Sequence, residues 1–281
     1  MCDLGKSVTL LISSDHLAER NSWPDMIRRA KSLGFLGIEL FGADLVGGPL
    51  ANTSSVRELR GLAEELDLIL TTHPWFDWTE FPEAKAIQEG IKLLHRCADL
   101  GARSVNFHLN FLSTPQDGCM RAAKITRAWL RLLEEHGQTL YFENVPCYLP
   151  NPFGSTPEEF SQFFELLDEH PNVKLNIDIG HANICGNLTE FITELGAFWN
   201  YTHIADNLGK VDDHLGPGMG SVDWENVALL ARSCGYQGAF VYEFSERYLP
   251  KSEPVLAQAF GWPKLAGKEA GQVDSASSPC R

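Results

Sequence analysis

The chain has 281 residues, long enough for one barrel of about 250 residues or for two smaller domains. With 44% hydrophobic and 21% charged residues, it has the composition of a folded globular protein, which excludes a disordered or fibrous one. Asp and Glu number 37 against 23 Lys and Arg, so the formal net charge is -14. This charge repels phosphate backbones and argues against nucleic-acid binding.

The chain shows no sign of a membrane or secretory segment. No stretch approaches the roughly 18 apolar residues that a membrane helix needs. The apolar stretch at residues 8–12 is short and follows no basic region, so we expect a first strand there rather than a signal peptide. The seven cysteines are scattered and form no CxxC pair, which argues against a disulfide framework or a thiolate zinc site. We therefore expect a cytoplasmic protein with reduced cysteines.

Short apolar segments alternate with longer amphipathic ones along the chain. The apolar segments predict strands at 8–13, 35–41, 66–73, 102–108, 138–144, 172–181, 201–206 and 238–244. The amphipathic segments predict helices that include 22–34, 55–67, 86–101 and 122–137. Ser22 or Asn21 can cap the first helix, with Pro24 just inside it. The glycines expected just past helix ends are Gly34, Gly101, Gly137 and Gly235.

Eight strands separated by helical or irregular connections predict an α/β fold, a single (β/α)8 TIM barrel with its active site at the C-terminal ends of the strands. An open doubly wound sheet is the alternative, but no GxGxxG follows the first strand and no GxxxxGK[ST] occurs. We expect the barrel domain to cover residues 1–266. The small, polar segment 267–281 is predicted to be a disordered tail.

Polar side chains occupy the predicted ends of strands two to eight, which meet at one mouth of a barrel. In chain order these residues are Glu39, His73, His108, Glu143, Asp178 with His181 three residues on, His203 and Glu243. The loop after strand seven adds Asp212, Asp213 and His214.

This combination of side chains predicts a divalent metal site. A lone His or Glu at a strand end is more often a hydrogen-bonded group than a ligand. Here, however, five of the nine histidines and three carboxylates converge on one mouth. Burying Glu143, Asp178 and Glu243 together is very costly without a cation. Their nitrogen and oxygen donors suit Mn, Zn, Co or Fe.

The chain resembles the xylose-isomerase-like TIM-barrel superfamily over roughly residues 8–250. That superfamily holds sugar isomerases and epimerases together with the endonuclease IV class of DNA-repair nucleases. The motifs that carry the resemblance are THPW, NFH, ENVP, DIGHANICG, HIADN, DDHLGPGMGSVDW and YEF. One departure concerns the arginine that some epimerases place after the strand-seven histidine, because this chain has Asn207 and Lys210 in that segment.

The two branches of the superfamily imply different metal counts. Resemblance to the isomerases and epimerases implies one metal held by Glu143, Asp178, His203 and Glu243, with His181 binding substrate. Resemblance to the nucleases implies up to three zinc ions and nine ligands. By motif these are His73, His108, Glu143, Asp178, His181, His203, Asp212, His214 and Glu243.

Charge favours the first branch. From Glu134 to Ala231 the only basic residues are Lys174 and Lys210, whereas a DNA backbone needs several Lys or Arg contacts. The same scarcity argues more weakly against a phosphorylated sugar, because helix N-termini can bind phosphate. Aromatic residues in the mouth loops either pack in the core or form a stacking wall for a sugar. They are Trp75, Phe76, Trp78, Tyr148 and Phe153, with Trp75 and Tyr148 our candidates for the substrate wall.

Several roles stay open at this point. Asp212, Asp213 and His214 either order their loop or line a second metal position. His73 and His108 either contact substrate hydroxyls or bind an additional metal. Glu39 is expected to tie down the barrel mouth by hydrogen bonding.

We expect an isomerase or epimerase of a small carbohydrate, a ketose or keto-polyol, that works through an enediolate with one divalent ion as Lewis acid. Glu143 and Glu243 would face opposite sides of the substrate and transfer the proton, while His181 and His108 hold hydroxyls. The alternatives are a trinuclear-zinc phosphodiester hydrolase of the endonuclease IV type, an inosose-dehydratase-type lyase and a non-enzymatic carbohydrate-binding barrel. By resemblance, the protein could form a homo-oligomer.

Overall fold

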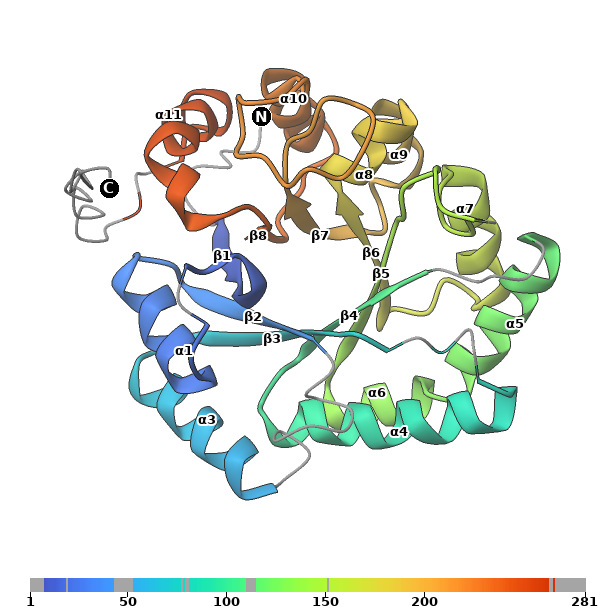
Figure 1. The fold of residues 1–281 in the computed structure, drawn as a ribbon. Coiled ribbons are helices and arrows are strands. Elements are labelled where there is room, and N and C mark those ends of the chain that lie inside the picture. Colours follow the sequence, from blue (N-terminus) through green and yellow to red (C-terminus); the bar gives the residue numbers. More distant parts are fainter. Residues whose placement is uncertain are drawn as a thin grey trace, which may run out of the picture.

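Eight parallel strands close into a barrel in chain order, which confirms the predicted fold. The computed structural model describes residues 8–18, 20–42, 53–76, 78, 81–109, 115–150, 152–262 and 265. Each strand pairs with the next along the chain, and β8 pairs with β1 (Figure 1). The strands are β1 (Thr9–Ser13), β2 (Gly37–Gly42), β3 (Ile69–Pro74), β4 (Ser104–His108), β5 (Thr139–Glu143), β6 (Val173–Asp178), β7 (Trp199–Ile204) and β8 (Ala239–Tyr242).

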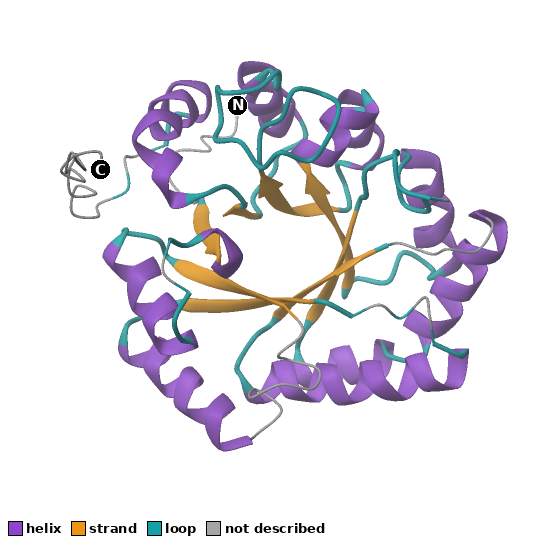
Figure 2. Ribbon diagram, in the orientation of Figure 1, coloured by secondary structure: helices purple, strands orange, loops and turns teal. Residues whose placement is uncertain are grey.

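Helices surround the strands as an outer ring, and Figure 2 shows the two layers by colour. Short turns of 3-10 helix, η1 (Ser14–His16) and η3 (Glu246–Tyr248), follow β1 and β8. The α-helices are α1 (Trp23–Ser32), α3 (Thr53–Glu65), α4 (Glu83–Asp99), α5 (Pro115–Arg127), α6 (Leu130–His136), α7 (Pro157–Leu166), α8 (Ile179–Cys185), α9 (Leu188–Leu195), α10 (Trp224–Ser233) and α11 (Leu249–Phe260).

Local sequence signals set the ends of these helices. The side chain of Ser22 caps α1 by accepting a hydrogen bond from the backbone N–H of Asp25, and Pro24 lies in the first turn. All four glycines predicted to end helices have positive φ, from 60° at Gly137 to 90° at Gly34. The start of α7 carries a capping box in which Thr156 and Glu159 exchange hydrogen bonds with each other's backbone.

Two predicted boundaries were wrong. The helix expected over 122–137 is two helices, because the chain turns at Ala128–Trp129. This turn places the fully buried Trp129 beneath α4, where its indole N–H donates to the carbonyl of Ile87 at 3.1 Å. The strand expected over 172–181 ends at Asp178, because the Asp178 side chain caps helix α8 there.

The interior of the barrel changes from apolar to polar towards the C-terminal ends of the strands. Because inward-facing residues of a barrel form layers contributed by alternate strands, successive layers can be followed upward. The lowest holds Leu11, Thr71, Tyr141 and Tyr201, the next Glu39, Asn106, Asn176 and Val241, and the one above Ser13, His73, Glu143 and His203. The side chains of Leu11, Tyr141 and Tyr201 in the lowest of these layers therefore pack together beneath the polar site.

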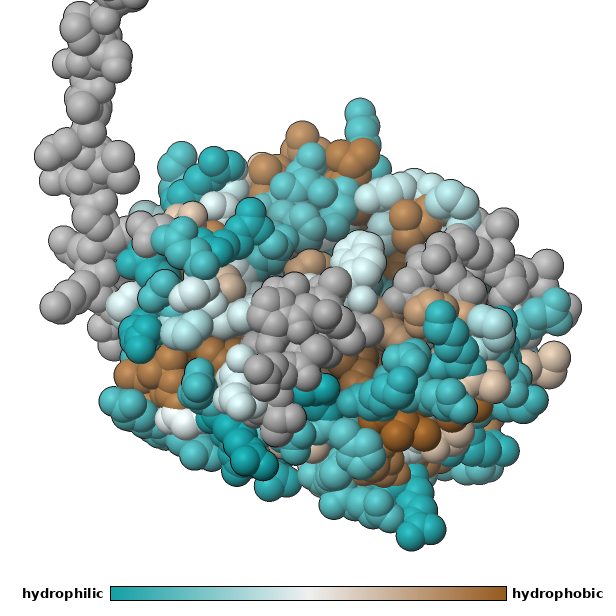
Figure 3. Space-filling view, turned by 60° about the horizontal axis from the view of Figure 1, so that its bottom comes forward, coloured by the Kyte–Doolittle hydropathy of each residue, from teal (hydrophilic) through white to brown (hydrophobic). Residues whose placement is uncertain are grey.

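One face of the molecule is mainly hydrophilic where its residues are coloured (Figure 3). On the face shown in Figure 3, hydrophilic residues cover most of the coloured surface and apolar ones occur in separate areas. Among the described residues, no helix is long and apolar enough to cross a membrane. The tail predicted at 267–281 lies outside the described residues, and the domain boundary at residue 266 stays a prediction.

Candidate active site

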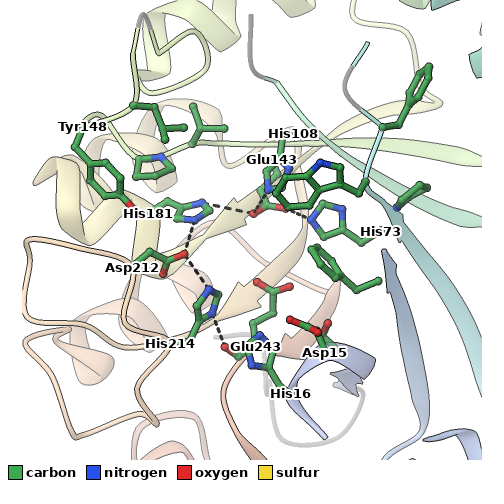
Figure 4. Close-up of a pocket in the computed structure, with 18 of the residues that line it drawn as sticks. Asp15, His16, His73, His108, Glu143, Tyr148, His181, Asp212, His214 and Glu243 are labelled. Atoms are coloured by element: carbon green, nitrogen blue, oxygen red, sulfur yellow. Dashed lines mark hydrogen bonds and ion pairs between the residues drawn. The ribbon is translucent and has the colours of Figure 1, made fainter. Parts of the chain in front are cut away.

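A cavity of about 380 Å³ opens at the C-terminal mouth of the barrel. The loops after several strands contribute to its walls, and Figure 4 shows their side chains pointing into it. The predicted residues that line it are His73, Trp75, His108, Glu143, Tyr148, His181, Asp212, His214 and Glu243. Ser13, Asp15, His16 and Phe41 also line the cavity, and none of them was predicted as a site residue.

Four of the predicted ligands form one compact group at the base of this cavity. Glu143, Asp178, His203 and Glu243 each offer a donor atom, and these atoms all lie within 4.8 Å of one another. All four residues are buried, with exposed fractions of 5% or less. A second, overlapping group consists of His73, Glu143 and His203.

Unpartnered atoms show that this group fits a cation. Asp178 Oδ2 and His203 Nδ1 are buried and have no hydrogen-bond partner. His203 Nδ1 lies 3.1 Å from Glu143 Oε2 and 3.2 Å from Glu243 Oε2, but not in hydrogen-bonding geometry. Buried polar atoms without partners are rare and costly. A divalent ion among one imidazole and three carboxylates would satisfy them.

Hydrogen bonds fix the positions of the Glu143 and Asp178 carboxylates. Glu143 Oε2 accepts from Asn106 Nδ2 at 2.7 Å and from Asn176 Nδ2 at 3.2 Å. Asp178 Oδ1 accepts from the backbone N–H of His181 at 2.6 Å, which leaves Oδ2 free. The two asparagines were not predicted as site residues. Each lies two positions before a polar residue at the end of its strand and therefore on the same inward face, and this spacing is the pattern that could have identified them.

Glu39 supports the histidine of the group from below. It accepts a hydrogen bond from the hydroxyl of Tyr201 at 2.8 Å, and its Oε1 lies 3.1 Å from Nε2 of His203. Glu39 thus makes hydrogen bonds as expected, but within the barrel rather than at its rim. When Nε2 donates its N–H to Glu39, Nδ1 keeps its lone pair and can bind an ion that lies among the carboxylates.

The buried carboxylates and imidazoles of the group shift one another's pKa values. Burial alone would raise the pKa of Glu143, but the surrounding imidazoles, that of His203 first, hold it well below its usual range. Burial alone would lower the pKa of His203, but Glu143, Glu243 and Glu39 raise it well above its usual range. Burial raises the pKa of Asp178 to about 7. In the protein without an ion, imidazoles thus balance the charge of Glu143, and a bound cation would take over this role.

His73 and His108 flank Glu143 on the side of the cavity. His73 Nε2 lies 3.3 Å from Glu143 Oε2, and His108 Nε2 lies 3.5 Å from Glu143 Oε1. Their ring centroids are 4.7 Å apart. Both histidines thus lie beside the predicted metal group. Their positions are compatible with contact to substrate hydroxyls and with binding of an additional metal.

Asp212 joins two histidines at the upper edge of the cavity. Its Oδ2 lies 3.2 Å from His181 Nε2 and 2.9 Å from His214 Nε2 (Figure 4). Burial alone would lower the pKa of both histidines, but contact with acidic groups raises it to about 10 for His181 and about 9 for His214. Asp213 is exposed and does not line the cavity.

The mouth aromatics separate into two sets. Trp75 and Tyr148 are 59% and 51% exposed and line the cavity. Phe76 and Trp78 also line the cavity but are largely buried, and Phe153, at 1% exposed, belongs to the core alone. Trp75 and Tyr148 thus have the exposure that a substrate wall requires. Among the described residues that line the cavity, none is Lys or Arg.

Comparison with known proteins defines the family. A family model for the xylose isomerase-like TIM barrel matches residues 27–265, so the chain belongs to that family. An uncharacterized protein of Methanocaldococcus jannaschii, MJ1311, is 31% identical over 133 residues, which is 46% of this chain and 45% of that protein. A second, MJ1614 of the same organism, is 29% identical over 93 residues, which is 33% of this chain and 34% of that protein. The chain thus matches less than half the length of these curated relatives.

Solved structures share the fold over nearly the whole barrel. A D-tagatose 3-epimerase-like protein superimposes with a TM-score of 0.78 at 20% identity, covering 90% of this chain and 97% of that chain. The 3-keto-D-glucoside 4-epimerase YcjR from E. coli superimposes with a TM-score of 0.71 at 18% identity, covering 90% of this chain and 98% of that chain. At these identities the similarity establishes the fold.

Proposed function

We propose that this chain is a divalent-metal-dependent isomerase or epimerase of a small, uncharged carbohydrate, a ketose or keto-polyol. The observation that carries the proposal is the group of Glu143, Asp178, His203 and Glu243 beneath a cavity whose described lining has no Lys or Arg. Such a site offers metal ligands and carboxylates but, among its described lining residues, no Lys or Arg for a phosphate. Structures of similar fold that are named as sugar epimerases support the same reaction class.

The four residues of the group would hold one Mn, Zn, Co or Fe ion. A divalent ion bound there supplies Lewis acidity, which makes a proton on carbon beside a carbonyl easier to remove. Asp178 and His203 do not line the cavity, so their part in the reaction would be to bind the ion rather than the substrate. Glu143 and Glu243 do line it, so their carboxylates can also reach a substrate.

Proton transfer is assigned to Glu143 and Glu243. Both project into the cavity, from β5 and from the end of β8, on different sides of it (Figure 4). One carboxylate would remove the carbon-bound proton to give an enediolate, and the other would return a proton. Return to the opposite face of the same carbon inverts it, and return to the neighbouring carbon moves the carbonyl.

The remaining cavity residues would orient the sugar. The imidazoles of His108 and His181 lie within reach of hydroxyl groups, and Asp212 orients His181. Trp75 and Tyr148 present exposed aromatic faces, against which the C–H face of a sugar can pack. The substrate would thus contact imidazole, carboxylate and aromatic side chains.

Solvent deuterium wash-in tests the proposal. The metal-loaded protein is incubated in D2O with a panel of ketoses and inososes, and deuterium on carbon is read by mass spectrometry and NMR. We expect at least one compound to exchange a single carbon-bound position. Absence of exchange across the panel would contradict proton transfer.

A second candidate is a phosphodiester hydrolase with three zinc ions. It is favoured by one observation: all nine residues matched to the nuclease motifs meet at this mouth, with His73, His108, His181, Asp212 and His214 around the central group. Metal analysis separates the two. One equivalent per chain supports the isomerase, and three equivalents with cleavage of an abasic duplex support the hydrolase.

A lyase of the inosose-dehydratase type would begin with the same proton removal. It would then lose a hydroxyl group from the adjacent carbon. A product lighter by one water molecule identifies this outcome in the deuterium experiment.

A further inference from the structure

Two cysteines from different mouth loops lie against each other beside the active-site cavity. Cys147 follows β5 and is exposed, whereas Cys185 is the last residue of α8 and is half-buried. The backbone N–H of Cys147 donates to the sulfur of Cys185 at 3.0 Å. The sulfur of Cys185 therefore lies directly beside Cys147 in the reduced protein, although the cysteines are 38 positions apart.

We propose that Cys147 and Cys185 form an intramolecular disulfide under oxidising conditions, with hydrogen peroxide as the oxidant. This goes beyond the proposed function and does not depend on it. The pair combines a solvent-accessible thiol with an adjacent resolving thiol, which is the arrangement of reversible cysteine oxidation sites.

The chemistry has a definite order. The exposed sulfur of Cys147 attacks one oxygen of hydrogen peroxide, which gives a sulfenic acid and releases one water. The sulfur of Cys185 then attacks the sulfur of Cys147, and the hydroxyl leaves with the proton of Cys185 as a second water. Two thiols are oxidised and one peroxide is reduced. Burial and the contact with Cys147 raise the pKa of the Cys185 thiol to about 12, which disfavours Cys185 as the thiol that attacks peroxide and leaves the first step to the exposed Cys147.

The crosslink would fix one wall of the cavity. Tyr148, which follows Cys147 directly, lines the cavity together with Asp212 from the loop after β7. The segment between Val145 and Gly154 is closed at its base by a backbone hydrogen bond of 2.9 Å. A disulfide to α8 would tie this segment to the helix that carries His181.

Other described cysteines do not compete for this pairing. Cys97 and Cys119 are fully buried in the core. Cys234 is exposed, but it caps the C-terminal end of α10, which by the topology of a barrel lies at the opposite face. Cys234 is therefore a matched control for an exposed thiol without a resolving partner.

Peptide mapping of the full chain tests the proposal. The reduced protein is treated with hydrogen peroxide, remaining thiols are alkylated, and crosslinked peptides are identified by mass spectrometry. We expect a peptide pair joining residues 147 and 185 in the wild type and in Cys234→Ser, and none in Cys147→Ser or Cys185→Ser. In the oxidised wild type, backbone amides of residues 145–154 should exchange with D2O more slowly, and dithiothreitol should reverse this.

Two outcomes would overturn the proposal. One is oxidation of Cys147 to sulfinic acid without a crosslink to Cys185. The other is pairing of either residue with a different cysteine as the main product. Both readouts are independent of catalysis, so a failure to find a carbohydrate substrate leaves this test intact.

Discussion

At the scale of single residues, two of the proposed ligands each divide their polar atoms between the fold and the ion. Asp178 uses Oδ1 to cap α8, which leaves a buried Oδ2 without a partner. His203 directs Nε2 towards Glu39, which leaves Nδ1 facing two carboxylates. Asp178 and His203 therefore each have one atom engaged by the fold and one directed into the group of ligands. Side chains preoriented in this way lose little freedom when they bind an ion.

Neutralising either proton-transfer residue should abolish most of the exchange. In Glu143→Gln and Glu243→Gln, the amide keeps the size of the side chain but cannot accept the proton. We expect deuterium wash-in to fall by about 10²- to 10⁴-fold in each variant. The matched control is Glu190→Gln, which changes an exposed glutamate on α9 and should leave the rate unchanged. Wild-type rates in either site variant would refute the assignment.

Glu39 offers a separate test of the metal site, because it touches the histidine but does not line the cavity. Replacing it in Glu39→Gln should weaken the orientation and basicity of His203. We expect the affinity for a divalent ion to fall roughly 10- to 100-fold by calorimetric titration. Tyr201→Phe is the comparison, since it removes one hydrogen bond to Glu39 and keeps the carboxylate. An affinity unchanged in Glu39→Gln would show that the carboxylate does not support the ligand.

At the scale of elements, alternation along each strand explains why the site could be predicted. Glu143, Asp178 and His203 lie on inward-facing positions at the carboxyl ends of strands, and these positions were readable from the pattern of apolar residues. The supporting asparagines were not, because Asn106 and Asn176 become meaningful only when strand pairing places them one layer below Glu143.

Helix boundaries were predictable where a capping residue marks them. The end of α1 at Gly34 and the end of α6 at Gly137 follow from residues that favour positive φ. The separation of α5 from α6 was not predicted, because helical periodicity continues through the turn. Only the burial of Trp129 against α4, a contact distant in sequence, explains the break.

The capping box of α7 gives a test of helix stability. In Thr156→Ala, the backbone N–H of Glu159 loses the hydroxyl that now accepts its hydrogen bond. We expect the free energy of unfolding to fall by about 0.5–2 kcal/mol in urea titrations. The control is Thr193→Ala within α9, where the hydroxyl bonds only to preceding carbonyls and its loss should change stability by less than about 0.5 kcal/mol. Equal stabilities of the two variants would contradict a capping role.

At the scale of the whole molecule, charge distribution separates the two candidate functions. The chain has a formal net charge of -14, and the described lining of its cavity has no Lys or Arg. The same nine chemical groups at the mouth would suit a nuclease, but no Lys or Arg accompanies them among the described residues that line the cavity. The fold was predictable because few folds accommodate eight similar strand-and-helix units in succession. The choice between a sugar and DNA as the substrate depends instead on the absence of Lys and Arg from the described lining of the cavity.

This charge distribution predicts weak interaction with DNA. We expect no measurable binding of a 20-base-pair abasic duplex at about 0.1 M salt, measured by fluorescence anisotropy with the metal-loaded protein. Net repulsion between two polyanions should persist when the duplex sequence is changed. Tight binding that weakens steeply with added salt would support the hydrolase instead.

Metal-dependent proton transfer is tested most directly by the rate of deuterium wash-in as a function of metal added to chelator-treated protein. With the compound that exchanges in the panel, the account predicts no exchange without metal and a rate that reaches its plateau at one equivalent per chain. Exchange that is unaffected by chelation, or that appears only with three equivalents, would contradict a single ion held by Glu143, Asp178, His203 and Glu243.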